Sequence, residues 1–216
     1  MLSPSTRLLL AFSAACVLPN AASGQVSYRA VALSDETPPG FSAGVTYGQL
    51  FPPSINNLGL VGFGSSLVGT GVDLPGNVTA IWRDEINSVP DLVVAAGGSV
   101  PGGESTEEFL VFSPTSVPLN DNGHVVFNAG VIEVLSGEHQ SSGTWTNVGG
   151  AGLTLVAREL SHAPGTPNPV VFDRLGWARI IGTDEVWFSA DLRNTEFGSP
   201  NVNSFNDDGV WANRPG

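Results

Sequence analysis

The stretch PSINNLGLVGF, from Pro53 to Phe63, decides the fold because the chain nearly repeats it as VPLNDNGHVVF, from Val117 to Phe127. In both copies a short hydrophobic segment leads into an Asn- and Gly-containing turn, and a strand-like run with a phenylalanine follows. Asn, Asp and Gly tolerate the left-handed backbone of tight hairpins. The stretch therefore predicts a recurring hairpin, and we expect positive φ angles at Gly59 and Gly123.

Other landmarks recur at nearly the same spacing. TAIW ends at Trp82 and GTW at Trp145, while LVVAAGGSVPG starts at Leu92 and LVARELSHAPG at Leu155. An earlier copy of the last phrase, AVALSDETPPG, starts at Ala30. Landmarks in constant order at a period of about 63 residues indicate an internal repeat.

A third, weaker copy follows the first two. EVWFSADL starts at Glu185 and DGVW ends at Trp211, but the turn reads IIGTDE, so that Ile181 stands where Asn56 and Asn120 stood. We expect this third turn to differ, because Asp184 takes the place of the turn glycine. The repeat phrases occupy residues 30–40, 47–102, 109–165 and 171–216.

Each repeat of about 63 residues predicts four antiparallel strands, with the phenylalanine on the second and the tryptophan on the third. Four such strands make a β-propeller blade, although known blade repeats are shorter, at about 40–50 residues. The expected fold is all-β and propeller-like but incomplete, with about three blades. We expect two sets of equivalent buried positions, namely Phe63, Phe127 and Phe188, and Trp82, Trp145 and Trp211.

The chain begins with a fourth-strand phrase and stops after a third-strand phrase. A closed ring would pair residues 29–34 with residues 208–213. Because propellers have typically 4–8 blades, the sequence favours an open arc instead. An open arc would leave strand edges free to pair with another chain.

The N-terminus has the pattern of a secretory signal peptide. Arg7 precedes the short apolar run Leu8–Leu18, and small residues precede Gln25. The run is too short to span a bilayer, which needs about 20 residues. We expect residues 1–24 to be a signal peptide and residues 25–216 to be the exported repeat domain, with no transmembrane segment after cleavage. Lipid attachment at Cys16, the only cysteine, is a lesser alternative.

Composition narrows the possible partners. The chain carries 8 Lys plus Arg against 20 Asp plus Glu, a formal net charge of −12 at pH 7. Nucleic acids and anionic membrane surfaces need clustered positive charge, so this acidic chain is not expected to bind them. An extracellular ligand or surface partner fits better, but the sequence does not say which.

The repeat phrases resemble a family of secreted bacterial repeat proteins of unknown function, whose units read approximately PSINDxGxVAF, GIW and LVARxGDxAPG. The matching stretches here are PSINNLGLVGF, VPLNDNGHVVF, AIW, GTW, GVW and LVARELSHAPG, spread over about Ala30 to Trp211. The resemblance implies a propeller-like all-β fold and an exported protein. It implies no known activity and supplies no catalytic residue.

No motif for a catalytic, cofactor or metal site stands out. NDDG at Asn206–Gly209 fits a hairpin turn better than a calcium loop. None of the three histidines, His124, His139 and His162, has a metal-like partner nearby, and we expect His124 at the surface or a sheet edge. GGSVPGG at Gly97–Gly103 lacks the lysine of a phosphate-binding loop. Asn77-Val78-Thr79 fits a glycosylation acceptor, but we expect it to be unused because the phrases resemble bacterial proteins.

Two hypotheses about function remain from the sequence. The first is an extracellular binding or scaffold module, since repeat stacks offer variable loops on one face. The second is an extracellular polysaccharide-acting enzyme that uses carboxylates in a central channel, for which Glu104, Glu107 and Glu108 in a predicted loop are the nearest acidic cluster. A non-functional fragment of a longer propeller is a further alternative.

Overall fold

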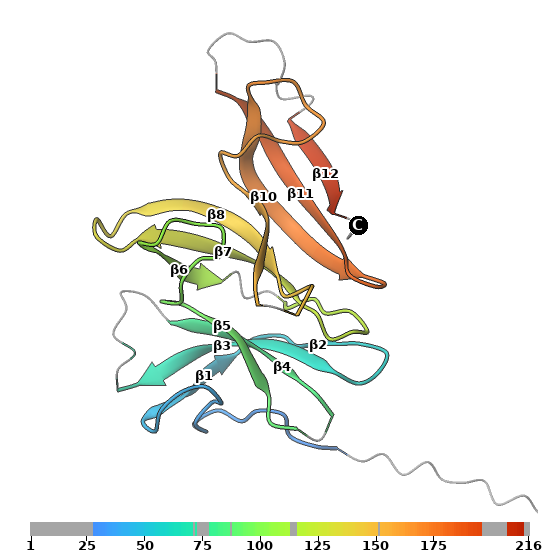
Figure 1. Cartoon of the computed structure of the whole chain (residues 1–216). Coiled ribbons are helices and arrows are strands. Elements are labelled where there is room, and N and C mark those ends of the chain that lie inside the picture. Colours follow the sequence, from blue (N-terminus) through green and yellow to red (C-terminus); the bar gives the residue numbers. More distant parts are fainter. Residues whose placement is uncertain are drawn as a thin grey trace, which may run out of the picture. The chain divides into compact units, whose positions relative to one another are not determined.

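The computed structural model describes residues 28–70, 72, 78–86, 88–112, 116–150, 152–195 and 207–213. Throughout these residues the protein is all-β, with twelve strands and no helix (Figure 1). No helix long and apolar enough to cross a membrane occurs in this part of the chain. The expected signal peptide, Cys16, Asn77 and Asn206 lie outside the described residues.

The strands form three antiparallel sheets. The first sheet contains β1 (Val45–Leu50), β2 (Ser54–Ile55), β3 (Val61–Gly69), β4 (Thr79–Asp84) and β5 (Asp91–Ala95). The second contains β6 (Glu107–Phe112), β7 (Val126–Glu133), β8 (His139–Thr146) and β9 (Thr154–Arg158). The third contains β10 (Val170–Ile181), β11 (Glu185–Asn194) and β12 (Asp208–Asn213).

Except for β1 and β2, which both pair with β3, strands that follow one another in the chain are neighbours in each sheet. The orders are β1-β3-β4-β5, with β2 also beside β3, then β6-β7-β8-β9 and β10-β11-β12. In each sheet one phenylalanine lies directly opposite one tryptophan of the next strand: Phe63 pairs with Trp82, Phe127 with Trp145 and Phe188 with Trp211. The ring planes of each pair are stacked, with centroids 5.6 to 6.3 Å apart.

The expected burial of these aromatic residues is confirmed for five of the six. Each phenylalanine is 4% exposed, and Trp82 and Trp145 are fully buried. Trp211 is only partly buried, so the expectation is wrong there. The physical reason is its position on β12, whose only partner among the described strands is β11, whereas Trp82 and Trp145 lie on strands paired on both sides.

Each tryptophan also ties down a proline-containing loop from earlier in the chain. The indole Nε1 of Trp82 donates to Pro39 O at 3.1 Å, that of Trp145 to Pro101 O at 3.2 Å, and that of Trp211 to Pro164 O at 3.1 Å. A buried indole N–H needs an acceptor, which these carbonyls provide. The repeated Pro-Gly phrase is thus fastened to the sheet that follows it in the chain.

The turn between the first strand pair of each sheet has the predicted backbone. Gly59 has φ +81° and Gly123 has φ +76°, which confirms the prediction. Asp184 has φ +95°, so the third turn does not differ at this position as we expected. It does differ two residues earlier, because Gly182 has φ +52° and the equivalent Asn57 and Asp121 have no positive φ. Aspartate is one of the few residues that tolerate this region without glycine's freedom.

Residues 31–34 and residues 208–213 do not pair as strands. Residues 30–34, expected to be a strand, belong to none, because no tryptophan strand lies beside them to supply hydrogen bonds. The chain instead contacts β1 just afterwards, where Asp35 N donates to Tyr47 O and Tyr47 N to Glu36 O. The pairing between residues 29–34 and 208–213 that a closed ring requires is absent from the pairings of the described residues.

Neighbouring sheets contact each other through opposite faces. We call the face with the stacked Phe–Trp pair the aromatic face and the other the reverse face. On the reverse face of the first sheet, a Cβ added at Gly62 would lie 3.4 Å from Val117 Cγ1 and 3.6 Å from Leu119 Cδ2, which lead into the second sheet's aromatic face. On the reverse face of the second sheet, Val126 joins the apolar cluster of Phe172, Phe188 and Ile180 in the third sheet.

Candidate functional site

The Asn-rich turns of the three sheets are joined by a ladder of hydrogen bonds. Within its own turn, the Oδ1 of Asn56 accepts from Leu58 N and Leu60 N, and the Oδ1 of Asn120 accepts from Asn122 N and His124 N. A carboxamide can accept and donate at once. The side-chain oxygen of the repeated asparagine therefore stabilises its own turn, and its Nδ2 can still donate a hydrogen bond to another turn.

That Nδ2 reaches the turn of the next sheet in both cases. Asn56 Nδ2 donates to Asn120 O at 2.8 Å, and Asn120 Nδ2 donates to Gly182 O at 3.2 Å and to Asp184 Oδ1 at 2.7 Å. The ladder ends at the third turn, because Ile181 has no amide to offer. This double use of one side chain is the physical reason for the repeated asparagine.

The Asp184 carboxylate, at the end of the ladder, contacts several hydrogen-bonding side chains. His124 Nδ1 lies 2.5 Å from Asp184 Oδ1, and Asn122 Nδ2 lies 3.4 Å from both carboxylate oxygens. Burial acts to raise the pKa of Asp184, but the hydrogen bonds from His124, Asn120 and Asn122 outweigh it and the pKa is lowered. The carboxylate form is therefore favoured, and it orients the His124 ring.

His124 also lines a polar hollow of about 440 Å³ between the first and second sheets. Arg83, Asp91 and Asn147 contribute the other side chains with polar ends, and Leu92, Val93 and Leu153 contribute apolar surface. Arg83 lies between acceptors, with Nη1 3.4 Å from Gly123 O and Nη2 3.6 Å from Asp91 Oδ2. The hollow thus presents a guanidinium, a carboxylate, an imidazole and a carboxamide beside aliphatic side chains.

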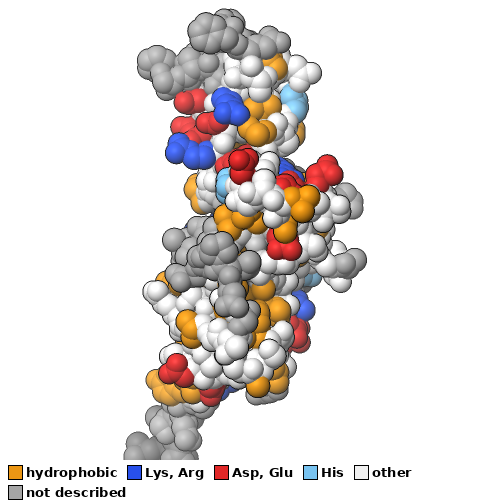
Figure 2. Space-filling model, turned by 90° about the vertical axis from the view of Figure 1, so that its left-hand side faces the viewer, with side chains coloured by type: hydrophobic (Ala, Val, Ile, Leu, Met, Phe, Trp, Pro, Cys, Tyr) orange, Lys and Arg blue, Asp and Glu red, His pale blue; other side chains and the backbone are white. Residues whose placement is uncertain are grey.

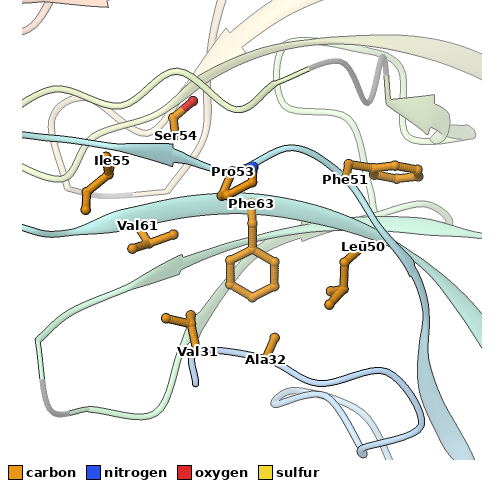
Figure 3. A pocket seen from close by; sticks show the side chains of 9 residues that line it. All are labelled: Val31, Ala32, Leu50, Phe51, Pro53, Ser54, Ile55, Val61 and Phe63. Carbon is orange, nitrogen blue, oxygen red and sulfur yellow. The ribbon is translucent and has the colours of Figure 1, made fainter. Parts of the chain in front are cut away.

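A second hollow, of about 390 Å³, is almost wholly apolar and opens on the aromatic face of the first sheet (Figure 3). In Figure 3 the Phe63 ring and the Leu50 side chain point toward the segment with Val31 and Ala32. Pro53 and Ile55 lie along the opposite side. This hollow offers apolar contact area and no charged group, so it suits an apolar partner rather than a polar ligand.

The acidic cluster predicted from the sequence is not the loop site that was expected. Glu107 and Glu108 lie in β6, and Glu107 is buried. Its carboxylate accepts from Arg158 Nη1 at 2.9 Å and Nη2 at 2.5 Å, and from Glu104 N at 2.9 Å. The hydrogen bond from Arg158 lowers the pKa of Glu107 despite burial. Glu107 fastens β6 to β9 and is not free for acid–base chemistry.

The remaining candidate residues from the sequence lie in strands or make hydrogen bonds within the fold. His124, expected at the surface or a sheet edge, is partly buried: its side chain is 20% exposed and is bound to Asp184. His139 begins β8, and His162 Nε2 lies 3.2 Å from Thr166 O. In the run from Gly97 to Gly103, Pro101 accepts from Trp145. The described residues contain no group of three His, Cys, Asp or Glu side chains able to hold a metal ion.

Sequence reasoning missed the polar hollow. The signal was present as a departure from the repeat: His124 stands where Leu60 and Glu185 stand, and Arg83 where Thr146 and Ala212 stand. Residues shared by the repeats build the fold, and residues that differ are free to build a site. Figure 2 shows acidic side chains next to basic ones on one face of the molecule. The ion pairs of the third sheet include Arg174–Asp191 and Arg193–Asp173.

The comparison with protein families matches nearly the whole chain. The model of a family of unknown function, DUF7453, matches residues 20–216. The chain belongs to the DUF7453 family. This agrees with the resemblance to an uncharacterised family found from the sequence. No curated protein matches this DUF7453 chain, and no solved structure does.

Proposed function

We propose that this DUF7453 chain is an exported, propeller-like binding module whose ligand site is the polar hollow lined by Arg83, Asp91, His124 and Asn147. The observation that carries the proposal is that the side chains shared by the repeats make structural contacts, whereas the side chains that differ between repeats line one hollow. The asparagine ladder and the Trp–Pro hydrogen bonds use the side chains common to the repeats. The polar side chains peculiar to one junction gather in one hollow.

The chemistry of the hollow favours a neutral, hydroxyl-rich ligand such as a saccharide. Its planar polar groups can donate to and accept from hydroxyls, while Leu92 and Leu153 offer apolar contact. An anionic ligand fits less well, because Asp91 and Glu85 already flank the Arg83 guanidinium. Binding is preferred to hydrolysis because Asp91 is the only acidic residue among the described residues that line this hollow, and glycoside hydrolysis ordinarily needs two carboxylates about 5–10 Å apart.

Affinity electrophoresis tests this proposal. The purified protein is run through gels containing a soluble β-glucan, an α-glucan or a galactomannan, and at least one should retard it. Arg83→Ala should abolish the retardation, because it removes the guanidinium group that lines the hollow. Arg174→Ala, at an exposed arginine of the third sheet, is the matched control and should migrate like the unmodified protein. Equal retardation of the Arg83 variant, or no retardation in any gel, would reject the saccharide site.

Export is the second part of the proposal. The apolar run Leu8–Leu18 followed by small residues supports removal of residues 1–24. When the chain is expressed in a bacterial host, the exported protein should begin at Gln25 by N-terminal sequencing. A protein that keeps Met1 and stays in the cytoplasm would contradict it, and a lipid-bearing N-terminus at Cys16 would replace it with the lipoprotein alternative.

A further inference from the structure

The aromatic face of the first sheet is open where the corresponding faces of the other two sheets are covered. Ile55, Leu119 and Ile180 hold the same place before the turn in the three sheets. Ile180 is 5% exposed and Leu119 is packed against the core, but Ile55 is 72% exposed. Val125 and Val186 are buried, whereas Val61 lines the apolar hollow. No described sheet therefore covers the aromatic face of the first sheet, which we call the acceptor face.

The reverse face of the third sheet is likewise not covered by another described sheet. Ile81, Thr144 and Val210 occupy the same place beside the tryptophan position, and the first two are buried against the next sheet. Val210 is 57% exposed. Trp187 and Ala212 are paired across strands on this same face, and Trp187 stands where Gly62 and Val126 make the internal contacts. This reverse face, which we call the donor face, is mixed, because Trp187, Val210 and Ala212 share it with Arg179, Ser189 and the Arg174–Asp191 ion pair. No described sheet follows it in the chain.

We propose that a second copy of this chain covers these faces, with the reverse face of one copy's third sheet seated in the apolar hollow of the other copy's first sheet. Each such contact repeats the internal junctions, in which a reverse face packs on an aromatic face. The hollow has the features of an unfilled junction, since its lining is apolar and its equivalents elsewhere in the chain are buried. An exposed apolar hollow of this kind is typical of an interaction surface.

Two copies are the number that the geometry favours. A head-to-tail contact forms a closed assembly only if the rotation between units closes. Two copies of the three described sheets give six, a number within the 4–8 blades of closed propellers, whereas three is below that range. The closed dimer contains two identical junctions and leaves neither face exposed. This inference concerns the apolar hollow and does not depend on the saccharide site.

Sedimentation equilibrium of the exported chain tests the inference. The unmodified protein should have twice the mass of one chain. Ile55→Glu on the acceptor face and Val210→Glu on the donor face should each raise the dissociation constant of the dimer about tenfold or more, because a carboxylate is buried without a partner. Val89→Glu is the matched control, since Val89 is a 69% exposed loop residue off both faces, and it should remain dimeric.

A cross-link separates loss of association from loss of folding. Gly62 contacts Leu119 at an internal junction, and Trp187 and Ile55 are the equivalent residues of the open faces. The double variant Ile55→Cys, Trp187→Cys should therefore form a disulfide between chains under oxidation and run as a covalent dimer. A monomeric unmodified protein would overturn the proposal, as would a dimer disrupted from one face only or a double variant that forms no link between chains.

Discussion

At the scale of single residues, the asparagine ladder depends on the carboxamide having both an acceptor and a donor. Asn120 is buried and its Nδ2 lies 2.7 Å from the Asp184 carboxylate. Asn56 makes the same use of its side chain, but its Nδ2 meets only the neutral carbonyl of Asn120. The two positions thus differ in the charge of the group that receives the hydrogen bond.

This difference makes a prediction for Asn120→Asp. The variant keeps the acceptor Oδ1 but places a second carboxylate against Asp184, and we expect a loss of about 2–4 kcal/mol in unfolding free energy at pH 7. Asn56→Asp is the control and should lose less, about 1–2 kcal/mol, because its neighbour is uncharged. Urea denaturation of both variants measures the difference. Equal losses would show that the Asp184 carboxylate has no part in the ladder.

Leu160 is a residue with a strained backbone and a ready test. Its φ is +68°, as at the equivalent positions Asp35 and Gly97, which have +68° and +81°. A leucine in this region costs about 1–2 kcal/mol, while glycine adopts it freely. Leu160→Gly should therefore stabilise the protein by about 1 kcal/mol, measured by urea denaturation. Leu33→Gly, at a similarly exposed leucine without positive φ, should not stabilise it.

At the scale of elements, each proline loop is held by the tryptophan of the sheet that follows it. The cost of removing the indole N–H should depend on how completely the tryptophan is buried. Trp145→Phe leaves Pro101 O without its donor in a buried site and should cost about 2–3 kcal/mol. Trp211→Phe, at the partly buried edge strand, should cost less than about 1 kcal/mol. Equal losses in thermal unfolding would mean that the edge position does not weaken the contact.

The Glu107–Arg158 pair links β6 to β9 and gives stability a dependence on pH. The pKa of Glu107 is lowered in the folded protein from its ordinary 4.5, so the unfolded chain takes up its proton at a higher pH than the folded protein. The pair's contribution is present above about pH 4.5 and is lost as pH falls through the lowered pKa.

Glu107→Gln should therefore be less stable than the unmodified protein at pH 7, because Arg158 loses its charged partner. Its stability should also fall less steeply between about pH 5 and pH 2. Denaturation curves over this range measure both effects. Glu108→Gln, the next residue on the other side of β6, is the control, and a Glu107 variant with an undiminished slope would contradict the linkage.

At the scale of the whole molecule, the three sheets are not equally supported. The first two share one apolar cluster, and the third has a smaller one to which the second contributes Val126 and Ala157. Among the described strands, β12 has a partner on one side only. Hydrogen exchange followed by mass spectrometry should find faster exchange in peptides from β12 than from β4 and β8, which are paired on both sides. Slower exchange in β12 would show that something covers its open edge.

The sequence by itself determined the all-β class and the glycine turns, since these depend on residues close together in the chain. A hairpin needs its turn residues, and a strand facing an apolar core needs its alternating pattern, so both are visible in PSINNLGLVGF and its copy. The burial of the phenylalanines followed for the same reason. The polar hollow could be suspected only as a set of departures from the repeat.

Only the tertiary structure decided what the repeated residues contact. Asn120 and Asp184 are 64 residues apart, and nothing local indicates that one donates to the other or that His124 joins them. The sequence predicts a loop at Glu107, because its partner Arg158 lies 51 residues away in the chain. The two residues are brought together only by the packing of β6 and β9 in one sheet. Sequence patterns report the geometry of one element, whereas hydrogen bonds and burial between sheets depend on how the elements pack.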